Sequence, residues 1–330
     1  MINKVKTQDI KMGMYILLPK KWFAHPFLKN EFIIDSPGQI TKLLEAGIAE
    51  VSIDSERSIF PREASRKEVV TETRKVLVPE ASKAHLPIIP PDLQEAIQDK
   101  KMPPAQKAKA IQLHSVVMIE RLMENPSTET IKEAKQGIAE VVDLILDDDA
   151  TNQQLLALTS HDYNTYVHSV NVGLLAISLA KTLFKRSNAH DMHELGAGFF
   201  LHDIGKVKVD VNIILKPAVL TDEEMLAMRR HPQYGYEILT QTNQSSEECK
   251  NVVLQHHERD NGRGYPQGLK GEEIHLYARI CSLADVYDAL SAKRPYRQQL
   301  RPFEALNVMK EEMLEHFHKE LFHKFVLLFQ

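Results

Sequence analysis

The pattern of apolar and polar positions divides the chain into two parts of different kind. From residue 105 onward, apolar residues recur at i, i+3 and i+4, as at Ile111, Ile119 and Leu122, which predicts amphipathic helices. The predicted helices span residues 105–124, 128–146, 153–158, 163–183, 192–201, 222–228, 232–239, 247–256, 276–291 and 302–316. Nearly every segment after residue 153 is helical in pattern, so an all-α bundle is expected over residues 151–330.

Residues 1–60 carry a different pattern. Short β-branched or aromatic runs at residues 14–18, 32–34 and 51–53 are separated by turn residues, and residues 39–45 look helical up to Gly47. This mixture predicts a small α+β N-terminal domain.

Between these parts, residues 61–104 are charged and punctuated by proline, including two Pro-Pro pairs. Paired prolines break helices and stiffen linkers, so a linker is predicted here. The two amphipathic helices within residues 105–150 then connect the parts. They could pack on the C-terminal half, join the two domains or support a homodimer.

Composition limits the possible functions. The formal net charge is −4 and the isoelectric point about 6.4, so no global field favours nucleic acid or anionic lipid, and an anion must be captured locally. Two distant cysteines exclude a disulfide framework and favour a reducing cytoplasm. The first residues lack the apolar core of a signal peptide. Residues 163–180 have no charged side chains, yet Asn164, His168 and Asn171 predict a buried helix and no membrane span.

The candidate chemistry centres on GAGFFLHDIGK at residues 196–206, an apolar segment that ends in His202 and Asp203. On a helix, Lys206 would share their face. Other candidate ligands lie beside or within apolar segments, and they are His168, His231, His256, His257 and Asp285. Five of the seven are histidines, the commonest ligands of transition metals.

Helix geometry limits how adjacent ligands can act. Neighbouring residues on a helix point about 100° apart, so His202 and Asp203 are not equivalent ligands of one ion. Asp203 has two oxygens, however, and could bridge two ions while His202 binds one. His256 and His257 pose the same problem, which is solved if they end a helix or lie in a loop.

His168, HDIGK at 202–206, His231, HHE at 256–258 and GRGYP at 262–266 occur in this order. The set resembles the HD-GYP family, the branch of the HD phosphohydrolase superfamily that hydrolyses cyclic dinucleotides, chiefly cyclic di-GMP. The resemblance covers about residues 150–330 and includes residues 216–239 and 284–297. Residues from Val5 onward are similar to a small domain often found ahead of HD-GYP domains in bacteria.

The resemblance implies a binuclear metal site. One ion would be held by His168, His202, Asp203 and Asp285, and the second by Asp203 as bridge with His231, His256 and His257. The family's usual metals are iron and manganese, and His-rich sites of this kind do not exclude zinc. Some members bind a third ion through a Glu four residues before the first His. Asn164 stands there in this sequence, so two ions are predicted.

The implied function is a cyclic di-GMP phosphodiesterase that yields linear pGpG, and after a second cleavage GMP, in bacterial second-messenger signalling. Two alternatives stay open: a phosphodiesterase for 3',3'-cyclic GMP-AMP, and a low-turnover cyclic-dinucleotide sensor or interaction module. In the enzyme, bridged metals would activate a water and clamp the phosphate, with Asp203 and Lys206 as catalytic residues.

Substrate contacts are expected around the GRGYP loop. Gly262 and Gly264 permit positive φ or a close backbone approach, and Asn261 is a good turn residue before them. Alone the loop is only a tight turn, but after the two histidines it predicts a wall of the site. The substrate contacts predicted are Lys206, Gly264, Tyr265, Pro266, Lys293, Arg294 and Arg297. The last three could instead be a solvated basic face. Signalling proteins of the GGDEF type are expected partners of this loop.

Overall fold

The chain divides into two units, residues 1–81 and 82–330, in the computed structural model. The structure describes residues 87–158, 164–184, 187, 189–216, 218–292 and 299–329 of the larger unit. In the smaller unit it describes residues 2–7, 10–11, 14–17, 31–34, 43, 48 and 50–54. The α+β and then all-α order predicted from the sequence is confirmed.

The smaller unit contains an antiparallel sheet of four strands in the order β1-β4-β2-β3. The strands are β1 (Ile2–Lys6), β2 (Tyr15–Leu17), β3 (Glu31–Ile33) and β4 (Glu50–Asp54). Its core includes Ile16, Val51 and Ile53. The last three strands agree with the prediction, whereas β1 was missed because INKVK has only two apolar residues. The helix expected at residues 39–45 lies outside the described residues except for Leu43.

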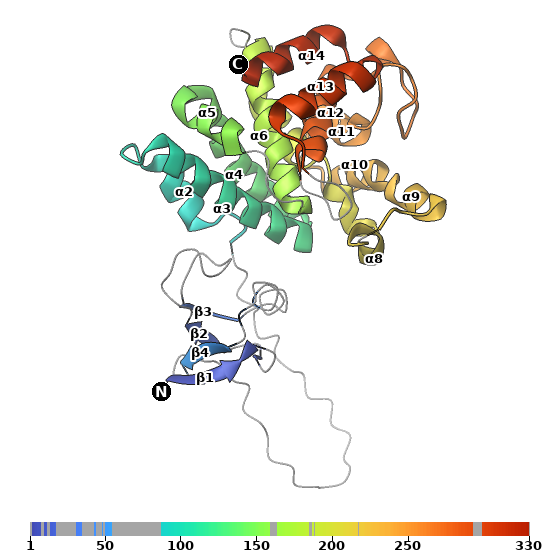
Figure 1. Cartoon of the computed structure of the whole chain (residues 1–330). Helices are drawn as coiled ribbons and strands as arrows, with labels where there is room; N and C mark the ends of the chain where they lie inside the picture. Colours follow the sequence, from blue (N-terminus) through green and yellow to red (C-terminus); the bar gives the residue numbers. More distant parts are fainter. Residues whose placement is uncertain are drawn as a thin grey trace. The chain divides into compact units, whose positions relative to one another are not determined.

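The larger unit consists of helices and loops (Figure 1). Its α-helices are α2 (Pro91–Gln98), α3 (Pro104–Glu124), α4 (Thr128–Asp147), α5 (Asp149–Leu158), α6 (Thr165–Phe184), α7 (Met192–Phe200), α8 (Val211–Ile214), α9 (Asp222–Met228), α10 (His231–Thr242), α11 (Glu247–Gln255), α12 (Leu276–Ser291), α13 (Pro302–Glu312) and α14 (Lys319–Val326). Short 3-10 helices are η2 (Ile204–Lys208), η3 (Gly271–Glu273), η4 (Leu314–His316) and η5 (Leu327–Phe329).

Helix α2 lies within the segment predicted to be a linker. Its Leu93 and Ala96 are buried, and it packs against α3 and α4. The Pro-Pro pairs begin α2 and α3 rather than breaking them, because each pair supplies the N-cap and the first helical residue. No backbone N–H is needed at the first helical position, and proline already has a helical φ. The helical unit therefore starts earlier than the sequence pattern suggested.

Helix α6 is the centre of the larger unit. It packs against α3, α7 and α12, and every residue from His168 to Ala180 is buried. Its length and apolar composition would suffice to cross a membrane, but most of it is enclosed by the other helices, as predicted. At Gly173 an added Cβ would lie 2.4 Å from the Phe200 ring, so this glycine lets α6 and α7 pack closely.

The segment after α7 fixes the place of His202 and Asp203. Asp191 caps the start of α7 by accepting from the backbone N–H groups of His193 and Glu194. The α-helix ends at Phe200, a turn holds residues 201–203, and η2 follows. At Gly205 a Cβ would lie 1.9 Å from the His231 carbonyl oxygen. Only glycine therefore allows η2 to pack against the first turn of α10.

Candidate metal centre

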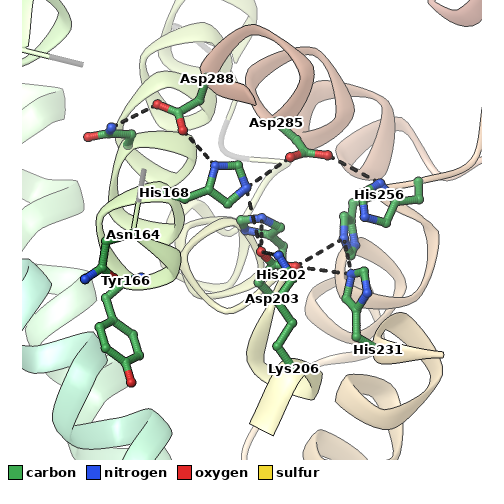
Figure 2. Close-up of polar contacts among 12 residues, drawn as sticks. Asn164, Tyr166, His168, His202, Asp203, Lys206, His231, His256, Asp285 and Asp288 are labelled. Carbon is green, nitrogen blue, oxygen red and sulfur yellow. Dashed lines mark hydrogen bonds and ion pairs between the residues drawn. The ribbon is translucent and has the colours of Figure 1, made fainter. Parts of the chain in front are cut away.

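The seven predicted ligand residues come together from five parts of the helical unit (Figure 2). His168 lies on α6 and Asp285 on α12. His202 and Asp203 follow the end of α7, His256 and His257 follow the end of α11, and His231 begins α10. The problem of adjacent ligands is thus solved by helix ends. All seven side chains are buried except His257, which is 25% exposed.

Their ligand atoms form two groups. Asp203, His231, His256 and His257 make one group, and His168, His202 and Asp285 make the other. Within each group the ligand atoms lie within 4.8 Å of one another. The six ligands other than Asp203 are divided as the family resemblance implied, while Asp203 is grouped with His231, His256 and His257 only.

The carboxylate of Asp203 faces both groups with different oxygens. Oδ1 lies 3.1 Å from Nε2 of His231 and 3.9 Å from Nε2 of His256. Oδ2 lies 3.5 Å from Nε2 of His202 and 3.6 Å from Nε2 of His168. The Lys206 ammonium donates to Oδ2 at 2.5 Å. One oxygen for each group is the geometry that a bridging carboxylate requires.

Three of the imidazoles are held in the same tautomer by the backbone. Nδ1 of His202, His231 and His256 lies 2.8–2.9 Å from the carbonyl oxygens of Phe199, Met228 and Val253, respectively. Because a carbonyl only accepts, each Nδ1 carries the proton. Each Nε2 therefore presents a lone pair to the centre, the state in which imidazole binds metal.

Two of these lone pairs lie close enough together to bind one cation. Nε2 of His231 and Nε2 of His256 are 3.2 Å apart, and both point toward Asp203 Oδ1. Among the described residues, Nε2 of His202 and Oδ1 of Asp203 are buried without a hydrogen-bond partner. Two ligands about 2.1 Å from one ion at right angles lie about 3 Å apart. The donor set and its spacing fit bound metal ions.

The electrostatics favour neutral side chains at His256 and His257 and ionised carboxylates at Asp203 and Asp285. Burial lowers the pKa of His256 well below 6.5 and that of His257 to about 3. Burial alone would raise the pKa of Asp203, but Lys206 and His202 hold it well below 3.8. Burial alone would also raise the pKa of Asp285, but its hydrogen bond with His168 and the nearby His257, His168 and His202 together lower it. Both carboxylates are therefore anionic.

His168 differs from the other imidazoles because it lies between two carboxylates (Figure 2). Nε2 is 3.1 Å from Asp285 Oδ1, and Nδ1 is 2.7 Å from Asp288 Oδ2. Burial would lower the pKa of His168, but these two hydrogen bonds raise it to about 10. Without a metal, His168 is an imidazolium ion that neutralises part of the acidic charge. A metal ion would replace the proton on Nε2 and leave the proton on Nδ1.

The loop after His257 is shaped by a buried carboxylate. Glu258 is 2% exposed and accepts from the backbone N–H groups of residues 267, 268 and 269 at 2.7–3.1 Å. Gly262 has a φ of +77°, and Asn261 Oδ1 accepts from the backbone N–H of Arg263. The predicted turn is therefore present. Gly264 has no positive φ. A Cβ there would lie 2.4 Å from Glu258 Cα, so close approach alone requires glycine.

Tyr265 connects this loop to the ligand cluster. Its ring packs on the His257 ring, with centroids 4.7 Å apart and an interplanar angle of 33°. The guanidinium carbon of Arg229 lies 5.3 Å from the centre of the Tyr265 ring, within the range of a cation–π contact. The loop thus lies against one side of the candidate metal centre.

Comparisons with known proteins agree with this geometry. The profile described as HD domain matches residues 150–321, and a domain of unknown function, DUF3391, matches residues 2–145. The chain belongs to the HD-domain family. It is 32% identical to "Cyclic di-GMP phosphodiesterase PA4108" of Pseudomonas aeruginosa over 99% of this chain and 76% of that relative.

Other relatives of the HD domain match shorter segments. Identity is 48% to "Cyclic di-GMP phosphodiesterase response regulator RpfG" of Xanthomonas campestris, over 30% of this chain and 26% of that one. It is 34% to "3'3'-cGAMP-specific phosphodiesterase 2" of Vibrio cholerae, over 48% of this chain and 31% of that one. Among solved structures, Bd1817, a HDG"Y"P protein from Bdellovibrio bacteriovorus, has a TM-score of 0.64 at 17% identity and covers 100% of this chain and 99% of its own. The predicted fold and family are confirmed.

Two residues that support the HD domain's ligands were missed from the sequence. Asp288 binds His168, and Asn171 donates to Asp288. Each lies three residues after a ligand on the same helix, Asp288 after Asp285 and Asn171 after His168. That spacing places each of them on the face of its ligand, and this signal could have found them. Glu258 belongs to the HHE motif, but the motif alone does not predict its contacts with the loop.

Three of the predicted substrate contacts lie outside the described residues of the HD domain. They are Lys293, Arg294 and Arg297.

Asn164 stands where some family members have a Glu that binds a third metal ion. It caps α6 by accepting from the backbone N–H of Tyr166 at 2.8 Å. That cap occupies the Asn164 side-chain oxygen.

Proposed function

We propose that the chain is a metal-dependent phosphodiesterase that hydrolyses cyclic di-GMP to linear pGpG, and by a second cleavage to GMP, in bacterial second-messenger signalling. The observation that carries this proposal is the pair of ligand groups that share the Asp203 carboxylate. The substrate class is supported by the relatives, which are named as phosphodiesterases of cyclic di-GMP or 3'3'-cGAMP. A phosphodiester is a stable anion, and its hydrolysis requires a strong nucleophile and neutralisation of charge on the phosphoryl oxygens.

The proposed cofactors are two divalent metal ions, iron or manganese. His168, His202 and Asp285 would hold one ion, His231, His256 and His257 the other, and Asp203 both. When bound, such ions supply an activated water and clamp the phosphate for in-line attack. Five imidazoles with two carboxylates and no thiolate suit iron or manganese. Because Asn164 is neutral and caps α6, no third ion is proposed.

The chain's own residues would do the remaining work. Asp203 keeps its negative charge between the two groups, and its bond to Lys206 sets the orientation of the carboxylate. Lys206 also adds an ammonium charge beside the position of the phosphate, where it would stabilise developing negative charge. Burial of the centre strengthens these interactions by excluding water. Gly264, Tyr265 and Pro266 would form a wall for the substrate.

Hydrolysis of a substrate panel tests this function. Protein purified under reducing, oxygen-free conditions and loaded with Mn²⁺ or Fe²⁺ should convert cyclic di-GMP to a linear product, as followed by chromatography. Hydrolysis of 3',3'-cyclic GMP-AMP in preference would establish the second candidate, which one group of relatives favours. Protein with both ions bound and no turnover of either substrate would refute the enzyme and support the sensor.

Four further expectations belong to this proposal. They are docking of GGDEF-type proteins on the GYP loop, substrate contacts by Lys293, Arg294 and Arg297, a homodimer, and a cytoplasmic location. The last is supported by the two cysteines, which are both buried free thiols. The homodimer is tested by light scattering of the full chain.

A further inference from the structure

A row of hydrogen-bonded side chains leads away from the candidate metal centre. It begins at His168, whose Nδ1 lies 2.7 Å from Asp288 Oδ2. The other oxygen of Asp288 accepts from Asn171 Nδ2 at 2.9 Å. Oδ1 of Asn171 in turn accepts from Gln112 Nε2 at 2.9 Å. The row therefore joins α12 and α6 to α3.

The row is enclosed in the helical unit. Asp288 is 1% exposed and Asn171 3% exposed, while Gln112 is half-buried at the outer end. The other contact of the Gln112 amide, to the Leu158 carbonyl, is long at 3.5 Å. Asn171 is thus the principal partner of the Gln112 side chain, and buried polar atoms in such a row depend on their partners.

The carboxylate of Asp288 fixes the direction of every hydrogen bond in the row. An ionised carboxylate only accepts, so Asp288 requires a donor from each side. On one side the donor is the Nδ1–H of His168, and on the other it is the amide NH₂ of Asn171. The Asn171 carbonyl oxygen must then face Gln112, which has to present its own NH₂. The amide orientations therefore follow from one acidic residue.

We propose that Asp288, Asn171 and Gln112 are positioning residues that hold His168 with its Nδ1 protonated and its Nε2 directed at the metal. Gln112 lies on α3, outside residues 150–321 matched by the HD domain and inside residues 2–145 matched by the domain of unknown function. The metal centre thus includes a support from the preceding region of the chain. This inference rests on the proposed function, because it presumes that His168 binds a metal ion.

Substitutions that keep shape and reverse polarity separate positioning from packing. In Asp288→Asn, either the Nδ1–H of His168 or the NH₂ group of Asn171 meets an NH₂ group instead of an oxygen. If that donor is His168, the ring changes tautomer and presents Nε2–H to the metal. In Gln112→Glu, a carboxylate faces the Asn171 oxygen, so Asn171 must turn its own oxygen toward Asp288. A packing role predicts no effect from either change, because side-chain volume is kept.

The principal measurement is Mn²⁺ binding to the full chain at stepwise lowered free Mn²⁺. Wild type is expected to bind two ions per chain. Asp288→Asn is expected to weaken one of the two ions by about 10–100-fold, the usual effect of losing the partner of a metal-bound histidine. Gln112→Glu is expected to weaken the same ion by about tenfold, the lower end of that range.

A matched control exists on α6, the helix that carries His168 and Asn171. Ser178 on α6 donates to Asn152 Oδ1 on α5 at 2.8 Å, a partly buried interhelical hydrogen bond that does not reach the ligands. Ser178→Ala should leave both ions at wild-type affinity. A loss of affinity in this control equal to that of Gln112→Glu would overturn the proposal, because any weakened helix contact would then have the same effect.

A spectroscopic measurement reports on His168 directly. In the Zn²⁺-loaded protein, the hydrogen-bonded Nδ1 proton of His168 should give a downfield NMR signal that is lost in Asp288→Asn and shifted in Gln112→Glu. If wild type binds two ions while both variants keep its affinities and its signal, the positioning role is refuted and the proposed function stands. If wild type binds no ion, the proposed function itself fails. Gln112→Glu at a half-buried site covers the case in which Asp288→Asn does not fold.

Discussion

The substitution Asp203→Asn tests the shared carboxylate most directly. It keeps the size of the side chain but removes its charge and replaces one oxygen with an NH₂ group. In the metal-free protein, Asp203 is 1% exposed and pairs with the largely buried Lys206 at 2.5 Å. Removing one partner of a buried ion pair costs about 3–5 kcal/mol. The free energy of unfolding should fall by about this amount.

The effect on metal binding should be larger than this loss of stability suggests. Each ion would lose a ligand, because Oδ1 faces His231 and His256 while Oδ2 faces His168 and His202. Loss of an outer partner weakens metal binding about 10–100-fold, so loss of a direct ligand should exceed about 100-fold for both ions. Hydrolysis of cyclic di-GMP should disappear with the ions.

Elemental analysis after dialysis against a fixed free Mn²⁺ concentration measures this effect, with urea unfolding in parallel. Glu194→Gln is the matched control, because Glu194 pairs with Lys135 between α7 and α4 and lies outside both ligand groups. It should lower stability and keep two ions. If Asp203→Asn keeps two ions per chain, the shared-carboxylate assignment is wrong. If it keeps one at wild-type affinity, Asp203 serves a single ion.

Three further predictions concern catalysis, the loop and pH. Lys206→Ala should lower kcat by about 10²–10³-fold, the usual effect of losing an electrostatic contact to a transition state, and two ions should still be bound. Loss of an ion would show that Lys206 has a structural role instead. Glu258→Ala removes the acceptor of three backbone N–H groups, so the free energy of unfolding should fall by about 3 kcal/mol. The KM should rise while the metal content stays unchanged, and an unchanged KM would show that the loop does not contact substrate. Burial lowers the pKa of His256 well below 6.5 and that of His257 to about 3, so below pH 6.5 these two residues bind more protons in the unfolded metal-free chain than in the folded one. The free energy of unfolding therefore falls by about 1.4 kcal/mol per pH unit for each proton as the pH drops. The pKa of His168, raised to about 10, makes stability fall as the pH rises from 6.5 toward 10. Urea unfolding in chelator should therefore show a maximum near pH 6.5, and a flat profile between pH 5 and 7 would contradict the buried neutral imidazoles.

The helices and the ligand cluster were accessible from the sequence because each leaves a periodic or motif signal. Helices α9 and α12 match the predicted limits, and α3 and α7 differ by one residue at an end. The sequence signal is ambiguous at the Pro-Pro pairs, because proline both breaks helices and begins them.

Supporting residues were harder to identify than ligands. Asp288 and Glu258 are ordinary acidic residues in the sequence, and their roles depend on which atoms the fold brings to them. The division of the Asp203 oxygens between the two groups is also a three-dimensional property. Spacing predicted that one carboxylate could bridge, but only the turn after α7 sets the direction of each oxygen.

The ends of α7 and α11 have a consequence for the electrostatic potential of the centre. Both helices finish at the ligands, where the carbonyl oxygens of Phe199 and Val253 face imidazole rings. The C-terminus of a helix carries about half a negative charge, and two such ends outweigh the single N-terminus that α10 presents at His231. They add to the negative charge of Asp203 and Asp285, which Lys206 and the His168 imidazolium offset in the metal-free protein. Bound cations would therefore supply the additional positive potential that attracts a phosphodiester anion to this centre.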